Sequence, residues 1–100
     1  MTTVKLSDSE VTARLEDLPD WSQPGEEIQR TFRFADFNAA MAFVETVAEH
    51  AERVQHHPDI LIRYSRVTLS LSTHDAGGIS EKDFEFATAA NAIASDLGAK

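Results

Sequence analysis

A long apolar stripe between Asp36 and Pro58 constrains the fold more than any other feature of the sequence. Its members recur at helical spacing and comprise Phe37, Ala40, Met41, Val44, Val47, Ala48, Ala51 and Val54. A stripe of this width is typical of a helix that covers a sheet. Asp36 can cap the helix, and Pro58 disfavours helical geometry at the residue before it. We therefore expect a long helix that ends near His56, with His56 and His57 in the turn to the next strand.

Alternating sequences on either side of this helix predict β-strands. Residues 28–34 and 67–72 alternate apolar with mostly polar side chains, which is the period of a strand with one buried face. Residues 60–65 are expected to form a strand with Ile60, Ile62 and Tyr64 on one face and Leu61, Arg63 and Ser65 on the other. A short strand at 21–23 is expected to pair with 28–34, and the two later strands are expected to form a second hairpin. The Ser65-Arg66 junction makes a poor two-residue turn, because neither residue adopts a positive φ readily. A longer or distorted turn is expected there.

Two further helices are marked by capping signals. Ser7 precedes Glu10 by three residues, and Ser80 precedes Asp83 by the same spacing. In such a pair the serine side chain caps the first turn while the acidic side chain returns to the serine backbone. The last helix is expected to stop at Gly98, since glycine adopts the left-handed conformation that commonly ends a helix.

The resulting order is helix, two strands, helix, two strands, helix. It predicts an α+β fold in a single domain over residues 1–100, with a four-stranded antiparallel sheet covered on one face by helices. On the other face Arg30, Thr68 and Ser70 are expected to be solvated, whereas Leu61 stays uncovered. An edge strand such as "RVTLSLS" can join the sheet of a neighbour. We therefore expect a homodimer or homotetramer.

Composition excludes several classes of partner and site. The 100-residue chain has no cysteine, which removes disulfides and thiolate chemistry and fits a reducing cytoplasm. Its formal net charge of -8 argues against direct contact with nucleic acid or an anionic membrane. The N-terminal segment "MTTVKLSDSEV" lacks the basic and apolar parts of a signal peptide. A cytoplasmic protein without a membrane span is expected.

Three histidines are expected to converge at one edge of the sheet. Because the two late strands form a hairpin, His74 returns to the edge where His56 and His57 lie. Imidazoles supply both a proton donor and a proton acceptor near neutral pH. Zinc bound with Asp59 or Asp83 is the alternative, but adjacent histidines rarely point at one ion and no helical H-x-x-x-H spacing is present. No metal is therefore expected.

Other histidine and aromatic side chains have simpler interpretations. His50, inside the long helix, is expected to be structural or solvated, because a site needs a constellation of residues. Tyr64 is expected to pack. Trp21 is more often a core residue, although a tryptophan beside a polar cleft can also stack on a flat heterocycle.

These residues together resemble the signature of the pterin-4a-carbinolamine dehydratases. The resemblance rests on "ERVQHHP" from Glu52, on Tyr64, and on "THDAGGISEKD" ending at Asp83. It implies removal of water from 4a-hydroxytetrahydropterin to give quinonoid dihydropterin, in the recycling of the pterin used by aromatic amino-acid hydroxylases, with no cofactor. It also implies His56 and His74 as the acid–base pair, assisted by His57. The implied substrate-binding residues are Glu52, Pro58, Asp59, Asp83 and Trp21.

Two departures from the family pattern lie on the second hairpin. Ser65 stands where members commonly carry Asn, and Leu61 often has a polar counterpart; altered turn geometry or subunit contacts are expected. The family also implies a second class of function, a protein-binding dimerisation cofactor with vestigial catalysis. A related pterin activity in molybdopterin or folate metabolism stays open. The intact histidine trio favours the enzyme.

Overall fold

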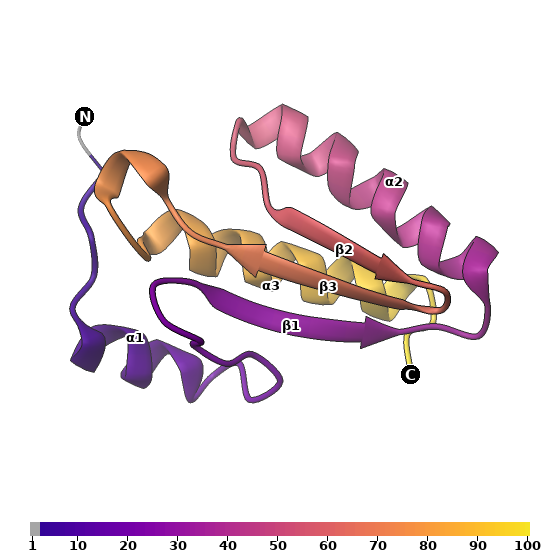
Figure 1. Cartoon of the computed structure of the whole chain (residues 1–100), viewed down its shortest axis with the longest axis horizontal. Coiled ribbons are helices and arrows are strands. Elements are labelled where there is room, and N and C mark those ends of the chain that lie inside the picture. Colours follow the sequence, from indigo (N-terminus) through magenta and orange to yellow (C-terminus); the bar gives the residue numbers. More distant parts are fainter. Residues whose placement is uncertain (1–2) are drawn as a thin grey trace.

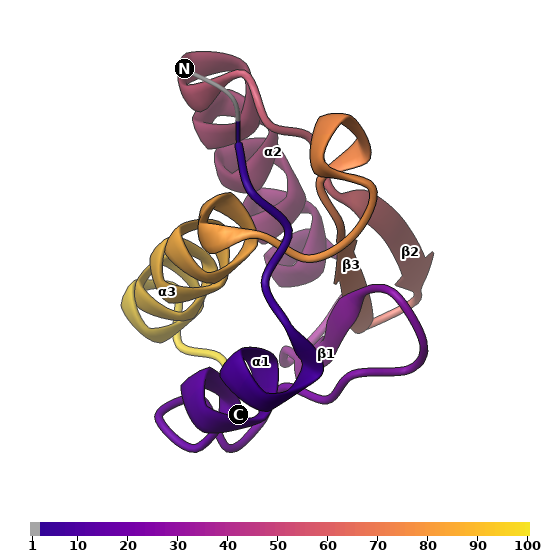
Figure 2. The same ribbon diagram turned by 90° about the vertical axis from the view of Figure 1, so that its left-hand side faces the viewer.

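The computed structural model describes residues 3–100; the first two residues of the N-terminal segment, where no signal peptide is expected, lie outside it. Its elements are α1 (Asp8–Leu15), β1 (Ile28–Arg33), α2 (Phe37–Val54), β2 (Asp59–Arg63), β3 (Arg66–Leu71), the 3-10 turn η1 (His74–Ala76) and α3 (Glu81–Asp96). The strands form a three-stranded antiparallel sheet in the order β1-β3-β2. Helices α2 and α3 lie on one face of it, and α1 lies beside β1 (Figure 1, Figure 2). The α+β class is confirmed.

Helix boundaries follow the capping signals of the sequence. The capping boxes expected at Ser7 and Ser80 are both present, and the Asp36 side chain caps α2 by accepting a backbone N–H at 2.8 Å. Helix α2 ends at Val54, two residues before His56, as Pro58 and its neighbours predict. Within residues 3–100, no helix combines the length and the apolarity that crossing a membrane requires.

The fourth strand expected at residues 21–23 does not form. Ser22 and Gln29 exchange two backbone hydrogen bonds of 2.9 Å, but they make an isolated bridge. Pairing stops there because Pro24 has no N–H to donate and because the Trp21 side chain turns into the core, where its ring is only 4% exposed. In the described part of the chain, the sheet therefore has three strands.

The strand expected at an edge, "RVTLSL", is instead the central strand β3. It pairs with β1 on one side, from Ile28↔Leu71 to Arg33↔Arg66, and with β2 on the other. Burial explains this order, because the alternate apolar side chains of β3 are fully buried whereas every residue of β2 is exposed. A strand with so little covered surface lies at an edge, and β2 is one of the two edge strands of the sheet.

The hairpin between β2 and β3 turns one residue earlier than expected. Arg63 pairs with Arg66, so the turn consists of Tyr64 and Ser65 alone. Tyr64 has a φ of 51°, in the left-handed region, which costs a non-glycine residue about 1–2 kcal/mol. Its side chain is 69% exposed, so the expectation that Tyr64 packs is wrong.

The hydrophobic core lies between the sheet and the two long helices. Strands β1 and β3 contribute side chains that are at most 1% exposed, namely Ile28, Phe32, Val67, Leu69 and Leu71. Helix α2 meets them with Phe43, whose ring centroid is 4.7 Å from that of Phe32. Full burial of one such side chain stabilises the fold by about 1.5–3 kcal/mol. This packing holds β3, and with it the β2–β3 hairpin, in a fixed position relative to α2.

The open face of the sheet is mostly polar. A hydrogen bond of 2.8 Å joins the hydroxyls of Thr31 and Thr68, and Leu61 on the same face is 55% exposed. Arg30, expected to be solvated there, lies on the helix-covered face instead. Its guanidinium donates to the Asn91 side chain at 2.6 Å and lies over a phenylalanine ring, so the charge keeps a polar partner at the edge of the core.

Candidate active site

The histidine pair lies in the turn that joins α2 to β2. Gln55, directly after the helix, has a left-handed conformation with φ 53°, and the His56 N–H donates to the carbonyl of Ala51 at 3.1 Å. This turn ends the helix and sends the two histidine side chains in different directions. His56 points toward α3 and its side chain is 12% exposed, whereas the His57 side chain is 56% exposed.

His56 is held by a buried carboxylate. Its Nε2 lies 2.6 Å from Oδ1 of Asp83, which is fully buried in the first turn of α3. The other carboxylate oxygen, Oδ2, accepts the Ser80 N–H at 2.9 Å and the Thr73 hydroxyl at 2.9 Å. One aspartate therefore caps α3 and fixes the orientation of an imidazole from a distant segment.

His57 has its own carboxylate partner on the surface. Its Nε2 lies 2.5 Å from Oε2 of Glu52, in the last turn of α2. Both side chains are more than half exposed, so solvent screens this pair and it contributes little to stability. The contact orients the His57 ring and links Glu52 to the histidine cluster.

His74 lies at the same end of the sheet, directly after a residue that contacts Asp83. It is the first residue of η1 and is exposed; Thr73, directly before it, donates to Asp83. The views agree that η1 and the α2–β2 turn lie at one end of the sheet (Figure 1, Figure 2). Within residues 3–100, no hydrogen bond joins one histidine ring to another. The segments expected to converge are thus adjacent, while the His56 and His57 rings have different carboxylate partners.

The other expected site residues divide into two groups. Pro58 is half-buried beside the histidines, and Asp59 is exposed where β2 begins. Trp21 is not with them. Its ring packs edge-on against Phe32 with centroids 6.0 Å apart, and its Nε1 donates to Asn91 at 2.9 Å. Trp21 is therefore a core residue, and its ring has no open face on which a ligand could stack.

A pocket of about 380 Å³ adjoins His56 between α2 and α3. It is lined by His50, Val54, His56, Lys82, Glu85 and Phe86. The Phe86 ring forms an apolar wall, with centroid distances of 5.0 Å to the His50 ring and 6.2 Å to the His56 ring. His50 is not among the site residues expected from the sequence. The feature that could have indicated it is the spacing of four residues between His50 and Val54, which places both side chains on the helix face that meets α3.

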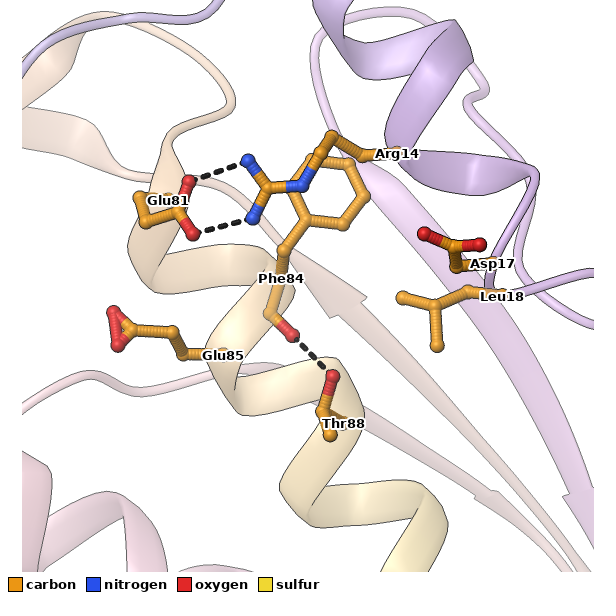
Figure 3. A pocket seen from close by; sticks show the side chains of 7 residues that line it. All are labelled: Arg14, Asp17, Leu18, Glu81, Phe84, Glu85 and Thr88. Carbon is orange, nitrogen blue, oxygen red and sulfur yellow. Dashed lines mark hydrogen bonds and ion pairs between the residues drawn. The ribbon is translucent and has the colours of Figure 1, made fainter.

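A second pocket, of about 600 Å³, lies between α1 and α3 (Figure 3). Its lining residues are Arg14, Asp17, Leu18, Glu81, Phe84, Glu85 and Thr88. Arg14 pairs with both carboxylate oxygens of Glu81 and lies 5.2 Å from the centre of the Phe84 ring. The hydrogen bond from Arg14 holds the pKa of Glu81 below its ordinary value, and the same bond raises the pKa of Arg14. Although this pocket is larger, it has no histidine and its guanidinium is already paired.

Two of the histidine rings are held by carboxylates, His56 by Asp83 and His57 by Glu52. Carboxylate-held imidazoles accept or donate a proton near neutral pH while the carboxylate stabilises the charged ring. His56 lies beside the smaller pocket, and His57 and His74 lie on the adjoining surface. Within residues 3–100, no group of three or more histidine, aspartate or glutamate side chains is arranged to hold a metal ion.

Comparison with known proteins places this geometry in a family context. The family described as pterin 4 alpha carbinolamine dehydratase matches residues 4–93. A Chloroflexus aurantiacus protein named "Putative pterin-4-alpha-carbinolamine dehydratase" is 56% identical over 89 residues, which are 89% of this chain and 96% of the relative. A Nocardia farcinica protein of the same name is 53% identical over 87 residues, covering 87% and 92%.

Two solved structures share the fold. A transcriptional coactivator/pterin dehydratase from Brucella melitensis has a TM-score of 0.85 and 38% identity, covering 90% of this chain and 98% of its own. A pterin dehydratase-like protein identified as a RuBisCO assembly factor in the alpha-carboxysome has a TM-score of 0.64 and 27% identity, covering 75% and 92%. The same fold is thus found in proteins described by catalysis and by assembly.

Proposed function

Because the chain belongs to the pterin 4 alpha carbinolamine dehydratase family, we propose that it removes water from a 4a-hydroxytetrahydropterin and releases the quinonoid dihydropterin. One observation carries the proposal. The His56 imidazole is held at 2.6 Å by the buried Asp83 carboxylate, beside a pocket and next to the segments that carry His57 and His74. A dehydration of this kind requires an acid and a base, and carboxylate-oriented imidazoles can supply both.

The reaction needs one proton delivered and one removed. The bond between C4a and the hydroxyl oxygen breaks, and a proton added to that oxygen completes a water molecule. The proton on N5 leaves, and its electron pair forms the C4a–N5 double bond. No electrons leave the substrate, so the proposed reaction needs no redox cofactor, and an acid and a base suffice for it.

We assign the acid–base pair to His56 and His74. His57, oriented by Glu52 at 2.5 Å, positions the pterin or assists the proton transfers. Pro58 and Asp59 shape the entrance, and Asp83 orients His56. Trp21 is given no substrate-binding role, because its ring is only 4% exposed.

The pocket beside His56 offers a place for the flat heterocycle. Its volume of about 380 Å³ lies in the usual range of small-molecule sites, and Phe86 presents an apolar wall. We propose that the pterin ring lies along this wall with its C4a–N5 edge toward His56. Lys82 and Glu85 line the same pocket and supply charged groups for the polar edge of the ring.

We also propose that the protein acts as a cytoplasmic homo-oligomer joined through β2. In the part of the chain that the structure describes, this strand pairs with β3 alone, and Ile60, Leu61 and Ile62 are 36%, 55% and 36% exposed. Two antiparallel copies of such an edge can pair about a twofold axis, which extends the sheet and covers these apolar side chains. Dimers or tetramers are both compatible with this contact.

A protein-binding role is the alternative, favoured by one specific observation. The fold neighbour with 27% identity is described as a RuBisCO assembly factor, so the fold also serves assembly. The apolar edge of β2 would be the binding surface in that case. The presence of three histidines at one end of the sheet favours the enzyme, because groups of titratable side chains are common in active sites.

A dehydration assay tests the proposal. The carbinolamine is generated in place and its decay is followed by absorbance with and without the purified chain. Acceleration is expected, with losses of about 100-fold or more for His56→Ala and for His74→Ala. Asp75→Ala is the matched control, because Asp75 is an exposed neighbour of His74 in η1 with no assigned role. No acceleration by the wild-type chain would favour the adaptor.

A further inference from the structure

Two buried hydroxyl groups lie behind the carboxylate that holds His56. The Thr73 side chain is 3% exposed and Ser80 is fully buried. Their hydroxyl oxygens are 2.5 Å apart, and Thr73 donates to Oδ2 of Asp83 at 2.9 Å. Ser80 is explained by its place as the N-cap of α3. Thr73 lies outside that helix, on the turn that follows β3, so helix capping does not account for it.

Counting hydrogens gives this network a single direction. At neutral pH an aspartate is ordinarily ionised, and its carboxylate only accepts hydrogen bonds. The one hydroxyl hydrogen of Thr73 is therefore directed to Asp83. The contact between the two hydroxyls must then be donated by Ser80, whose oxygen remains free to accept the Lys82 N–H at 3.3 Å. Each hydroxyl hydrogen of this network therefore has one possible acceptor.

The same assignment of donors and acceptors fixes the tautomer of the His56 imidazole. Because Oδ1 of Asp83 can only accept, the contact of 2.6 Å from His56 must be donated by Nε2–H. The neutral ring then carries its lone pair on Nδ1. Within residues 3–100, Nδ1 has no hydrogen-bond partner, and no side-chain nitrogen or oxygen that is fully buried lacks one. It follows that Nδ1 reaches the surface, on a ring that lines the pocket between α2 and α3.

We propose that Thr73 is a positioning residue for the dehydration. Its hydroxyl, held by Ser80, fixes the Asp83 carboxylate as acceptor of His56 Nε2–H. Nδ1 is thereby the atom of His56 that exchanges the proton of the reaction. This holds for either role of His56: as an acid it gives the Nδ1 proton to the departing hydroxyl, and as a base it takes the N5 proton on Nδ1. The inference rests on the proposed function for its place in the reaction.

The test compares Thr73→Val, which keeps the shape and removes the hydroxyl, with Thr73→Ser, which keeps the hydroxyl. The ¹⁵N chemical shifts of the His56 ring report its tautomer without any need for turnover. Wild type and Thr73→Ser are expected to show the Nε2–H tautomer alone. In Thr73→Val, Oδ2 of Asp83 keeps only the Ser80 N–H, so we expect the carboxylate to turn away from Nε2 in part of the molecules. Those rings lose the contact that selects Nε2–H, which gives a mixture of tautomers and about a tenfold loss of kcat with little change in KM. Melting temperatures, measured for all three, separate this loss from unfolding.

Several results would overturn the inference. An Nδ1–H tautomer in the wild type would do so whether or not the valine variant folds. So would a valine variant that keeps the Nε2–H tautomer, whatever its kcat, because the hydroxyl would then not act through the ring. A wild-type chain with the expected tautomer but no dehydratase activity would leave the positioning contact standing and remove the proposed function.

Discussion

Asp83→Asn should separate the stability of this protein from its activity. The amide has the size of the carboxylate, and its oxygen can take the place of Oδ2, which accepts Ser80 N–H and the Thr73 hydroxyl at 2.9 Å each. The –NH₂ group then replaces Oδ1. Losing the negative charge at the start of α3 and one charge-assisted hydrogen bond is expected to lower the free energy of unfolding by about 1–2 kcal/mol. The fold should survive.

The activity should fall much further. An amide –NH₂ facing Nε2 at the position of Oδ1 can only donate, so the His56 ring must adopt the Nδ1–H tautomer. Nδ1, the ring nitrogen that reaches the surface, then carries a proton in the neutral ring and cannot act as base, and the charged ring loses its carboxylate. A wrong tautomer in a carboxylate–imidazole pair can cost up to about 10⁴-fold in kcat, and we expect a loss of at least about 100-fold. Absorbance of the decaying carbinolamine measures it.

Asp83→Ala is the matched comparison. It removes all three hydrogen bonds to the carboxylate and leaves the buried Thr73 hydroxyl and Ser80 N–H without their acceptor. Each such loss costs about 1–3 kcal/mol, so a decrease of about 3–5 kcal/mol in the free energy of unfolding is expected from chemical denaturation. An Asp83→Asn protein that folds and keeps kcat within about threefold of wild type would refute the reasoning, because the tautomer of His56 would then be irrelevant.

Three further predictions concern other parts of the molecule. His50→Ala removes one wall of the pocket beside His56 and should raise KM more than it lowers kcat; the reverse pattern in steady-state kinetics would place His50 in the chemistry. Glu81→Gln should lower stability by about 0.5 kcal/mol at pH 7. Because Arg14 lowers the pKa of Glu81, the stabilisation is full above the ordinary value of 4.5 and is lost as the pH falls through the lowered pKa. If the wild type and Glu81→Gln still differed in denaturation midpoint well below the lowered pKa of Glu81, the prediction would be contradicted. Ile62→Lys on the exposed edge of β2 should shift the sedimenting species toward the 11.1 kDa monomer; an unchanged oligomer would place the interface elsewhere.

Local signals in the sequence predicted the helices well. Serine and aspartate caps act within three residues of the helix they start, so Ser7, Asp36 and Ser80 could be interpreted without knowledge of the fold. The end of α2 before His56 follows from Pro58 in the same way. Strand order cannot be derived from such local signals, because it depends on which surfaces of the chain become buried against each other. The central place of β3 and the loss of a strand at Trp21 therefore needed the tertiary structure.

For the candidate site, the sequence indicated which segments lie together but not the geometry of their side chains. Spacing indicated that the histidines lie at one end of the sheet, yet the divergence of His56 and His57 depends on the left-handed Gln55, a conformation that glutamine seldom adopts. Thr73 carries no signal of its own, since a threonine after a strand is common. Its contact with Asp83, ten residues away, exists only because η1 folds back onto the start of α3.

A crystal structure with an unreactive pterin analogue tests the central claim most directly. The account predicts the analogue in the pocket between α2 and α3, with Nδ1 of His56 and the ring of His74 both within hydrogen-bonding distance of the C4a–N5 edge. An analogue bound in the Arg14 pocket, or one touched by His56 while His74 faces another surface, would contradict the account.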